Sequence, residues 1–126
     1  MSAWPVVLVV DDESMVRRAL QRELSAEFEV LEADGPAAAL ALLGSHGCKV
    51  VAIVSDLDMD GDRGAGLLLL ARVAEELPTC IRILVSGSLA AQFGQMPHAE
   101  VTIAKPWTAG EIRAAIRQRL QDFAGR

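Results

Sequence analysis

Short apolar runs alternate with amphipathic stretches from one end of the chain to the other. Three of the runs are continuously apolar and rich in β-branched residues, which is typical of strands that are covered on both faces of a parallel sheet. Two further runs are weaker and are expected nearer the sheet edges. The strands predicted in this way are Val6–Val10, Phe28–Ala33, Val50–Val54, Ile81–Val85 and Val101–Ala104.

The stretches between the predicted strands carry apolar residues at intervals of three and four, as amphipathic helices do. Pro36 suits the first turn of the second helix, with Asp34 as its cap and Gly44 as its end. Thr108 and Glu111 have the spacing of a capping box at the start of the last helix. The predicted helices cover residues 15–24, 36–43, 67–77, 89–96 and 108–123, of which the fourth is short and interrupted by glycine.

Strands and helices that alternate strictly along a chain predict an α/β layer sandwich with right-handed crossovers. The 126 residues are enough for one globular domain with a sizeable core, and too few for two ordinary domains. Neither a change in composition nor an internal repeat divides the sequence. We therefore expect a single α/β domain that covers residues 1–126.

Composition and charge exclude several classes of protein. Apolar residues make up 52% of the chain and charged residues 23%, which excludes a disordered or low-complexity chain. A formal charge of −5 opposes binding to a phosphate backbone, so we expect no direct contact with nucleic acid. No run approaches the roughly 20 apolar residues of a membrane span, and no secretory signal is recognisable, so we expect a cytoplasmic protein without membrane contact. Cys48 and Cys80 lack metal-site spacing and are expected to be small buried hydrophobic side chains.

Polar side chains follow four of the five predicted strands. Asp11 and Asp12 follow the first strand, Asp56 the third, Ser86 the fourth and Lys105 the fifth. Since the chemistry of parallel α/β sheets gathers at the carboxyl ends of the strands, we expect these side chains on one rim. Three carboxylates there repel one another unless one is protonated or a divalent cation binds. Oxygen ligands at this density suit Mg²⁺.

Lys105 is one of only two lysines in the chain, and two interpretations of it stay open. A lysine among carboxylates can neutralise them as a structural ion pair. A carboxylate, a hard cation, a lysine and a hydroxyl on one rim are also the groups that bind and transfer a phosphoryl group, because this chemistry depends mainly on positioning and charge compensation. An aspartate can itself be the nucleophile and form an aspartyl phosphate.

The chain from Val6 to about Phe123 resembles the receiver domains of two-component response regulators. Four motifs in the family's order carry the resemblance: VLVVDDE at 7–13, AIVSDLDM at 52–59 with Gly64 downstream, ILVSGS at 83–88 and AKPW at 104–107. Each motif alone is weak, whereas four in order at this spacing are specific. The resemblance implies a flavodoxin-like (βα)5 three-layer sandwich whose parallel five-stranded sheet has the order 2-1-3-4-5.

The resemblance also implies a phospho-acceptor and a Mg²⁺ site. Asp56 is the expected acceptor, which attacks the phosphoryl group of a phosphohistidine on a sensor histidine kinase or a phosphotransfer protein. Asp12 and Asp56 are the expected direct ligands of Mg²⁺. The backbone carbonyl of Asp58 is the expected third ligand, and Asp11 is expected to act mainly through water.

The same resemblance implies roles for the remaining polar groups. Lys105 is expected to pair with the acceptor carboxylate and then with a phosphoryl oxygen, while Ser86 hydrogen-bonds another phosphoryl oxygen. The peptide bond between Lys105 and Pro106 is expected to be cis. The sequence departs from the family at Thr102, where an aromatic residue often stands. We therefore expect the signal to travel through the loop after Ser86 and the helix over 89–96 without such a ring.

The resemblance further implies a switch that acts on other proteins, and not an enzyme that turns over an external substrate. Phosphorylation is expected to favour one of two conformations. Because no output domain follows Phe123, the effect is expected to reach a separate downstream protein or a homodimer. The expected contact surface is the face formed by the helix over 89–96, the strand Val101–Ala104 and the last helix. Trp107 lies two residues after the lysine, so its fluorescence is expected to report on occupancy of the site.

Three other interpretations compete with this one. Segment 56–61 begins like an EF-hand calcium loop, but the twelfth position is Leu67 in place of a glutamate. Asp56 and Asp58 also resemble the first motif of haloacid dehalogenase-like phosphatases, which form an aspartyl phosphate with Mg²⁺, although the paired acids come first here and a cap domain has no room. A receiver-like scaffold that is never phosphorylated is the third alternative.

Overall fold

The computed structural model describes residues 4–87 and 97–124. Five parallel strands form one sheet in the order β2-β1-β3-β4-β5, which confirms the predicted topology. β2 and β5 are the edge strands, as their weaker apolar patterns indicate. The strands are β1 (Val6–Val10), β2 (Glu29–Ala33), β3 (Val50–Asp56), β4 (Ile81–Ser86) and β5 (Val101–Ala104).

Helices connect the strands, and the described ranges include four α-helices and one short 3-10 helix. They are α1 (Ser14–Leu24), α2 (Pro36–His46), η1 (Gly47–Lys49), α3 (Ala65–Glu76) and α4 (Glu111–Ala124). The helix predicted over 89–96 lies outside the described residues, so α4 is the last of the predicted helices. Within residues 4–87 and 97–124, no helix is long and apolar enough to cross a membrane.

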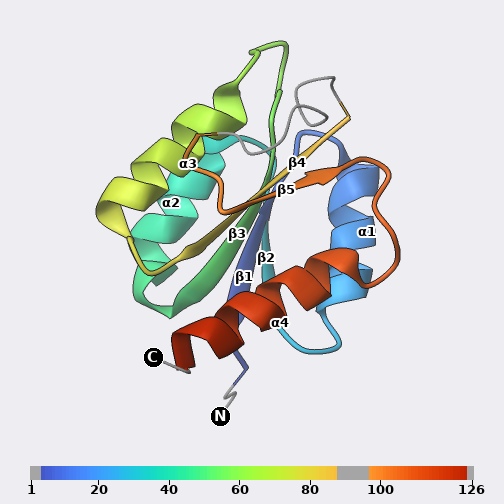
Figure 1. Ribbon diagram of the computed structural model, residues 1–126. Helices are drawn as coiled ribbons and strands as arrows, with labels where there is room; N and C mark the ends of the chain where they lie inside the picture. The colour runs from blue at the N-terminus through green and yellow to red at the C-terminus, as the bar shows by residue number, and fades with distance from the viewer. Residues whose placement is uncertain (1–3, 88–96, 125–126) are drawn as a thin grey trace.

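The helices form two layers that enclose the sheet (Figure 1). α2 and α3 lie on one face, and α1 and α4 lie on the other. Alternate residues of β1 point into different cores: Leu8 and Val10 pack with the α2–α3 layer, whereas Val7 and Val9 pack with the α1–α4 layer. All four side chains are completely buried, which explains why β1 is continuously apolar.

Two predictions about helix ends are wrong. α2 continues past Gly44 to His46, because a glycine in a helix interior costs only about 1 kcal/mol relative to alanine and does not break the helix by itself. Asp34 does not cap α2: the cap position is Gly35, and no side chain hydrogen-bonds there. Pro36 is the first residue of the helix, as predicted.

The start of α4 and the state of one cysteine agree with the sequence pattern. The backbone N–H of Thr108 donates to Glu111 Oε1 at 2.9 Å, which is one of the two hydrogen bonds of a capping box. Ile112 and Ile116 are completely buried on the predicted apolar stripe. Cys80 is buried with a free thiol, as expected.

Candidate functional site

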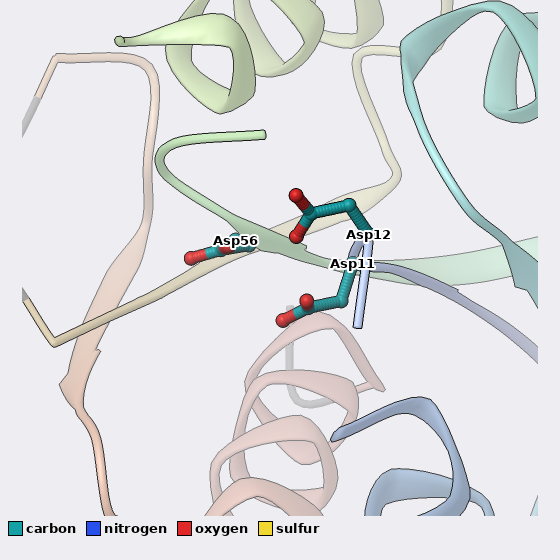
Figure 2. A group of neighbouring side chains, drawn as sticks. All are labelled: Asp11, Asp12 and Asp56. Atoms are coloured by element: carbon teal, nitrogen blue, oxygen red, sulfur yellow. The ribbon is translucent and has the colours of Figure 1, made fainter. Parts of the chain in front are cut away.

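Three carboxylates meet where β1 and β3 end. β1 pairs with β3, Asp11 and Asp12 directly follow β1, and Asp56 is the last residue of β3. Carboxylate oxygens of the three residues lie within 4.8 Å of one another, as Figure 2 shows for their side chains. Asp11 is buried, Asp56 is largely buried and Asp12 is exposed, so the cluster opens to solvent on one side. The parallel-sheet argument therefore placed all three acids correctly.

Lys105 reaches the same cluster from the end of β5. Its Nζ donates to Asp11 Oδ2 at 2.9 Å and lies 3.3 Å from Asp56 Oδ1. Its backbone N–H donates to the carbonyl of Ser86 at 2.9 Å, and the bond to Pro106 is cis, as expected. Ser86 itself is the last residue of β4 and is buried. All five side chains predicted for the rim thus lie at, or directly after, the carboxyl ends of strands of one sheet.

Burial and neighbouring charges together set the pKa values of Asp56 and Lys105. Burial raises the pKa of Asp56 to about 6, the negative charge of Asp11 adds to the rise, and Lys105 opposes it. Burial alone lowers the pKa of Lys105, but the hydrogen bond and charge of Asp11, followed by those of Asp56, raise it above its ordinary value. The lysine therefore stays charged, and Asp56 is mainly ionised at neutral pH.

In the metal-free protein, Asp56 should make the free energy of unfolding fall as the pH rises from 3.8 to about 6. The unfolded carboxyl releases its proton near 3.8, whereas the folded protein holds it until about 6. Stabilisation that is fully present below the lower value is therefore lost as the pH rises through the higher one. Since one pKa unit corresponds to about 1.4 kcal/mol, the loss is at most about 3 kcal/mol.

Urea unfolding in EDTA, across this pH range, tests that expectation. Asp11, Asp12 and Lys105 face Asp56 and are the same in wild type and in Asp56→Asn, so the difference between the two proteins isolates the contribution of the Asp56 carboxyl. The variant should lack the decline between pH 3.8 and about 6. Parallel pH courses for the two proteins would show that the Asp56 carboxyl is not perturbed in this way.

The charges of the cluster suit a divalent cation. Three carboxylates and one ammonium leave two negative charges uncompensated. Carboxylate oxygens are the ligands that Mg²⁺ takes in proteins, at about 2.1 Å. Asp11 already accepts two hydrogen bonds, from Lys105 and from the backbone N–H of Glu13 at 2.9 Å. Both oxygens of Asp11 are thus occupied, whereas among the described residues Asp56 accepts from Leu57 N–H through Oδ1 alone and Asp12 accepts from Asp60 N–H through Oδ2 alone. The donor set therefore fits Mg²⁺.

The loop after β3 is shaped by its own carboxylates. Asp58 Oδ1 accepts a hydrogen bond from Gly64 N–H at 2.8 Å, and the N–H of Asp60 donates to Asp12 Oδ2 at 2.9 Å. Asp60 has a φ of 53°, a left-handed conformation that aspartate tolerates better than most residues. The side chain of Asp58 thus closes the loop. Within the described residues, the side chains that come together as a group able to hold a metal ion are Asp11, Asp12 and Asp56, and this group does not include Asp58 or Asp60 of the EF-hand-like segment.

Two residues near the cluster were not singled out from the sequence. A Cβ atom on Gly66 would lie 1.9 Å from the carbonyl oxygen of Asp56, so the start of α3 approaches the end of β3 more closely than a residue with a side chain would allow. Arg17 Nη1 donates to the carbonyl of Asp11 at 2.9 Å, and its Nε lies 3.4 Å from Glu32 Oε1. A glycine inside a leucine-rich helix is a recognisable signal, whereas nothing local distinguishes Arg17 from other arginines on the polar face.

Thr102 lies on β5, three residues before Lys105. Its hydroxyl oxygen is buried, and it has no hydrogen-bond partner among the described residues. The helix over 89–96, through which the signal is expected to travel in place of an aromatic side chain, lies outside the described residues. The expected signal route thus stays a prediction.

Comparison with known proteins identifies the family. A family model for the response regulator receiver domain matches residues 7–117. The chain belongs to the response regulator receiver domain family. The family is a signalling module and not a classical enzyme, and its members bind Mg²⁺ at an acidic pocket, which in this chain corresponds to the aspartate cluster. Membership also decides against the haloacid dehalogenase-like phosphatase.

Relatives of this receiver domain include regulators of transcription. It is 34% identical over 119 residues to the hydrogenase transcriptional regulatory protein HoxA of Cupriavidus necator, and 32% identical over 125 residues to HoxA of Bradyrhizobium diazoefficiens. These matches cover 91% and 96% of this chain, but 24% and 25% of the relatives. The chain therefore spans about a quarter of the length of the curated relatives it matches.

Solved structures share the fold. The signal receiver domain of an HD domain-containing protein from Pseudomonas fluorescens has a TM-score of 0.82 and 28% identity, over 98% of this chain and 99% of that one. The response regulator TrrA from Thermotoga maritima, solved in complex with Mg²⁺–BeF, has a TM-score of 0.78 and 21% identity, over 91% and 98% of the two chains. At 21% identity, the second likeness concerns the fold alone.

Proposed function

We propose that Asp56 is the phospho-acceptor of this receiver domain, and that its phosphorylation switches a surface that binds another protein. The phosphoryl donor is a phosphohistidine on a sensor histidine kinase or a phosphotransfer protein, as membership of the family implies. The observation that carries the proposal is the joint contact of Lys105 Nζ with Asp11 and Asp56. This contact puts a fixed positive charge beside a carboxylate that is 11% exposed, where incoming negative charge has to be stabilised.

The transfer exchanges one bond to phosphorus for another. A carboxylate oxygen of Asp56 attacks the phosphorus atom, the bond from phosphorus to the imidazole nitrogen of the donor breaks, and the electron pair stays on that nitrogen. The other imidazole nitrogen of the donor carries a proton, so the donor leaves as a neutral histidine and Asp56 becomes an acyl phosphate. Lys105 Nζ then pairs with one phosphoryl oxygen, and the Ser86 hydroxyl donates to another. A pKa of about 6 keeps Asp56 mainly ionised, and therefore nucleophilic, at neutral pH.

Mg²⁺ is part of the proposal. The carboxylates of Asp12 and Asp56 and the backbone carbonyl of Asp58 are the proposed direct ligands, with Asp11 acting through water. When bound, the ion supplies the positive charge that the cluster lacks, which lowers the repulsion met by an incoming phosphoryl group. The TrrA protein, which shares this fold, was solved in complex with Mg²⁺–BeF.

The output of the switch is another protein or a second copy of this chain. The proposed contact face comprises β5, α4 and the segment over 89–96, and phosphorylation acts by shifting a two-state equilibrium. The similarity to hydrogenase transcriptional regulatory proteins supports a role in regulated transcription for the whole protein. The domain itself undergoes one phosphorylation per site and does not turn over an external substrate.

Incubation with acetyl phosphate should add one phosphoryl group to the protein, as detected by intact mass, and only in the presence of Mg²⁺. Asp56→Asn removes the nucleophile with little change in shape and should abolish the adduct. The absence of any adduct on the wild type, under conditions where Mg²⁺ binds, would favour a scaffold that is never phosphorylated. Catalytic release of free phosphate that persists in Asp56→Asn would contradict the role of Asp56 as the acceptor.

A further inference from the structure

The amino end of α4 is closed by a side chain from α1. Glu23 Oε1 accepts hydrogen bonds from the indole Nε1–H of Trp107 at 3.0 Å and from Gly110 N–H at 3.1 Å, and Oε2 accepts one from Arg113 N–H at 3.2 Å. The first N–H groups of a helix have no partner within the helix, and a carboxylate there is also favoured by the helix dipole. Glu23 therefore caps α4 from a position 87 residues away in sequence.

The same carboxylate holds the segment that carries the lysine of the site. Trp107 lies two residues after Lys105, and Figure 1 shows the connection from β5 to α4 passing beside α1. At its start, this connection is fixed by Lys105, which binds the Ser86 carbonyl through its N–H and two carboxylates through Nζ. At its end, it is fixed by Glu23 through Trp107 and Gly110.

A second link between the same parts of the chain offers a comparison. Arg117 of α4 donates to Glu27 at 2.6 Å and 3.2 Å, but both side chains are substantially exposed. This pair joins α4 to the turn after α1, and within residues 4–87 and 97–124 its hydrogen bonds do not involve the segment from Lys105 to Gly110. Exposed ion pairs contribute little to stability. The Glu27–Arg117 pair, like the Glu23 contacts, links the region of α1 to α4. Unlike Glu23, it forms no hydrogen bond to Trp107 or Gly110 among the described residues.

We infer that Glu23 is a positioning residue for Lys105. By binding Trp107 and the amino end of α4, it holds the connecting segment where Lys105 Nζ contacts both Asp11 and Asp56. Loss of Glu23 releases the far end of the segment, and the lysine then no longer meets the two carboxylates in one fixed geometry. The expected effect of Glu23 on phosphorylation rests on the proposed function of the Asp56 site. The contact between Glu23 and Trp107 does not depend on that function.

The kinetic test compares Glu23→Ala with Glu27→Ala as the matched control. Glu23→Ala should lower the saturating rate of phosphorylation by acetyl phosphate about 10-fold to 100-fold, as loss of groups that orient a reacting side chain does. The donor concentration at half-saturation should change less, since the phosphodonor does not touch Glu23. Glu23→Gln keeps one acceptor oxygen and should recover part of the rate, whereas Glu27→Ala should behave like wild type. A wild-type rate in Glu23→Ala, or an equal loss in both alanine variants, would overturn the inference.

Fluorescence gives a readout that needs no phosphorylation. In a Trp4→Phe background, Trp107 is the only tryptophan, and Lys105→Met should shift its emission. That shift should disappear when Glu23→Ala is added, because the segment is then no longer fixed at both ends. The same shift with and without Glu23 would contradict the inference. A wild-type protein that acquires no adduct would overturn the proposed function, and the fluorescence result would then decide the inference about Glu23.

Discussion

Lys105→Met is expected to lower the rate of phosphorylation by acetyl phosphate about 10²-fold to 10³-fold, the usual cost of removing one preorganised electrostatic group from a site. Lys105 Nζ is the cation that contacts both Asp11 and Asp56. Without it, the pKa of Asp56 rises further, because Lys105 opposes the rise caused by burial and by Asp11. A larger fraction of the acceptor is then protonated, and the transferred phosphoryl group loses its partner. Initial rates from intact mass in saturating Mg²⁺ measure the effect.

Lys49 provides the control for the loss of a lysine. It is the only other lysine of the chain, it is exposed, and it precedes β3 at the opposite end of the strand from Asp56. Lys49→Met should therefore leave the rate unchanged. An unaltered rate in Lys105→Met, or equal losses in both variants, would contradict the role given to the contacts of Lys105.

Gly66→Ala is expected to destabilise the protein by about 1–3 kcal/mol, the range found for overfilled cores. The added Cβ atom would lie 1.9 Å from the carbonyl oxygen of Asp56 and 3.0 Å from Leu57 Cα. Both neighbours are backbone atoms, so α3 and the end of β3 must separate. That movement also breaks the hydrogen bond from Gly66 N–H to the carbonyl of Leu57, now 2.8 Å long, and displaces the acceptor. Urea unfolding should show the lost stability, and intact mass a slower phosphorylation.

Gly44→Ala is the matched substitution elsewhere in the fold. Gly44 also lies inside a helix, but a Cβ atom there meets nothing within 4 Å. Alanine is the better helix former, so this variant should gain up to about 1 kcal/mol. Equal stabilities of Gly66→Ala and Gly44→Ala would contradict the close contact between α3 and the backbone of Asp56.

The fold and the members of the acid cluster follow from simple patterns. The continuously apolar runs identify buried parallel strands, and the strand ends of such a sheet lie on one rim. These two rules are enough to bring Asp11, Asp56 and Lys105 together, although they are up to 94 residues apart. The sheet order required the resemblance to receiver domains, because local patterns do not say which strands are neighbours.

The contacts around the cluster could not be predicted in the same way. Glu23 caps a helix 87 residues away, and no local pattern indicates which distant N–H groups a carboxylate will meet. The leucine run 67–70 is uniformly apolar in sequence, yet Leu68 is 72% exposed while Leu69 and Leu70 are buried. Four consecutive residues surround a helix, so all of them cannot face one core. The cap and the end of α2 were also predicted wrongly, because tertiary packing determines where a helix begins and ends as much as a glycine does.

The location of the phosphoryl group tests the central claim most directly. After phosphorylation in Mg²⁺, reduction with borodeuteride converts an aspartyl phosphate to labelled homoserine, which a peptide mass spectrum locates. Trypsin cleaves after Lys49 and Arg63 and releases one peptide that contains Asp56 with three further aspartates, so fragmentation distinguishes the four positions. We predict homoserine at position 56 alone. Homoserine at another aspartate, or none in a protein that carries the adduct, would contradict the account.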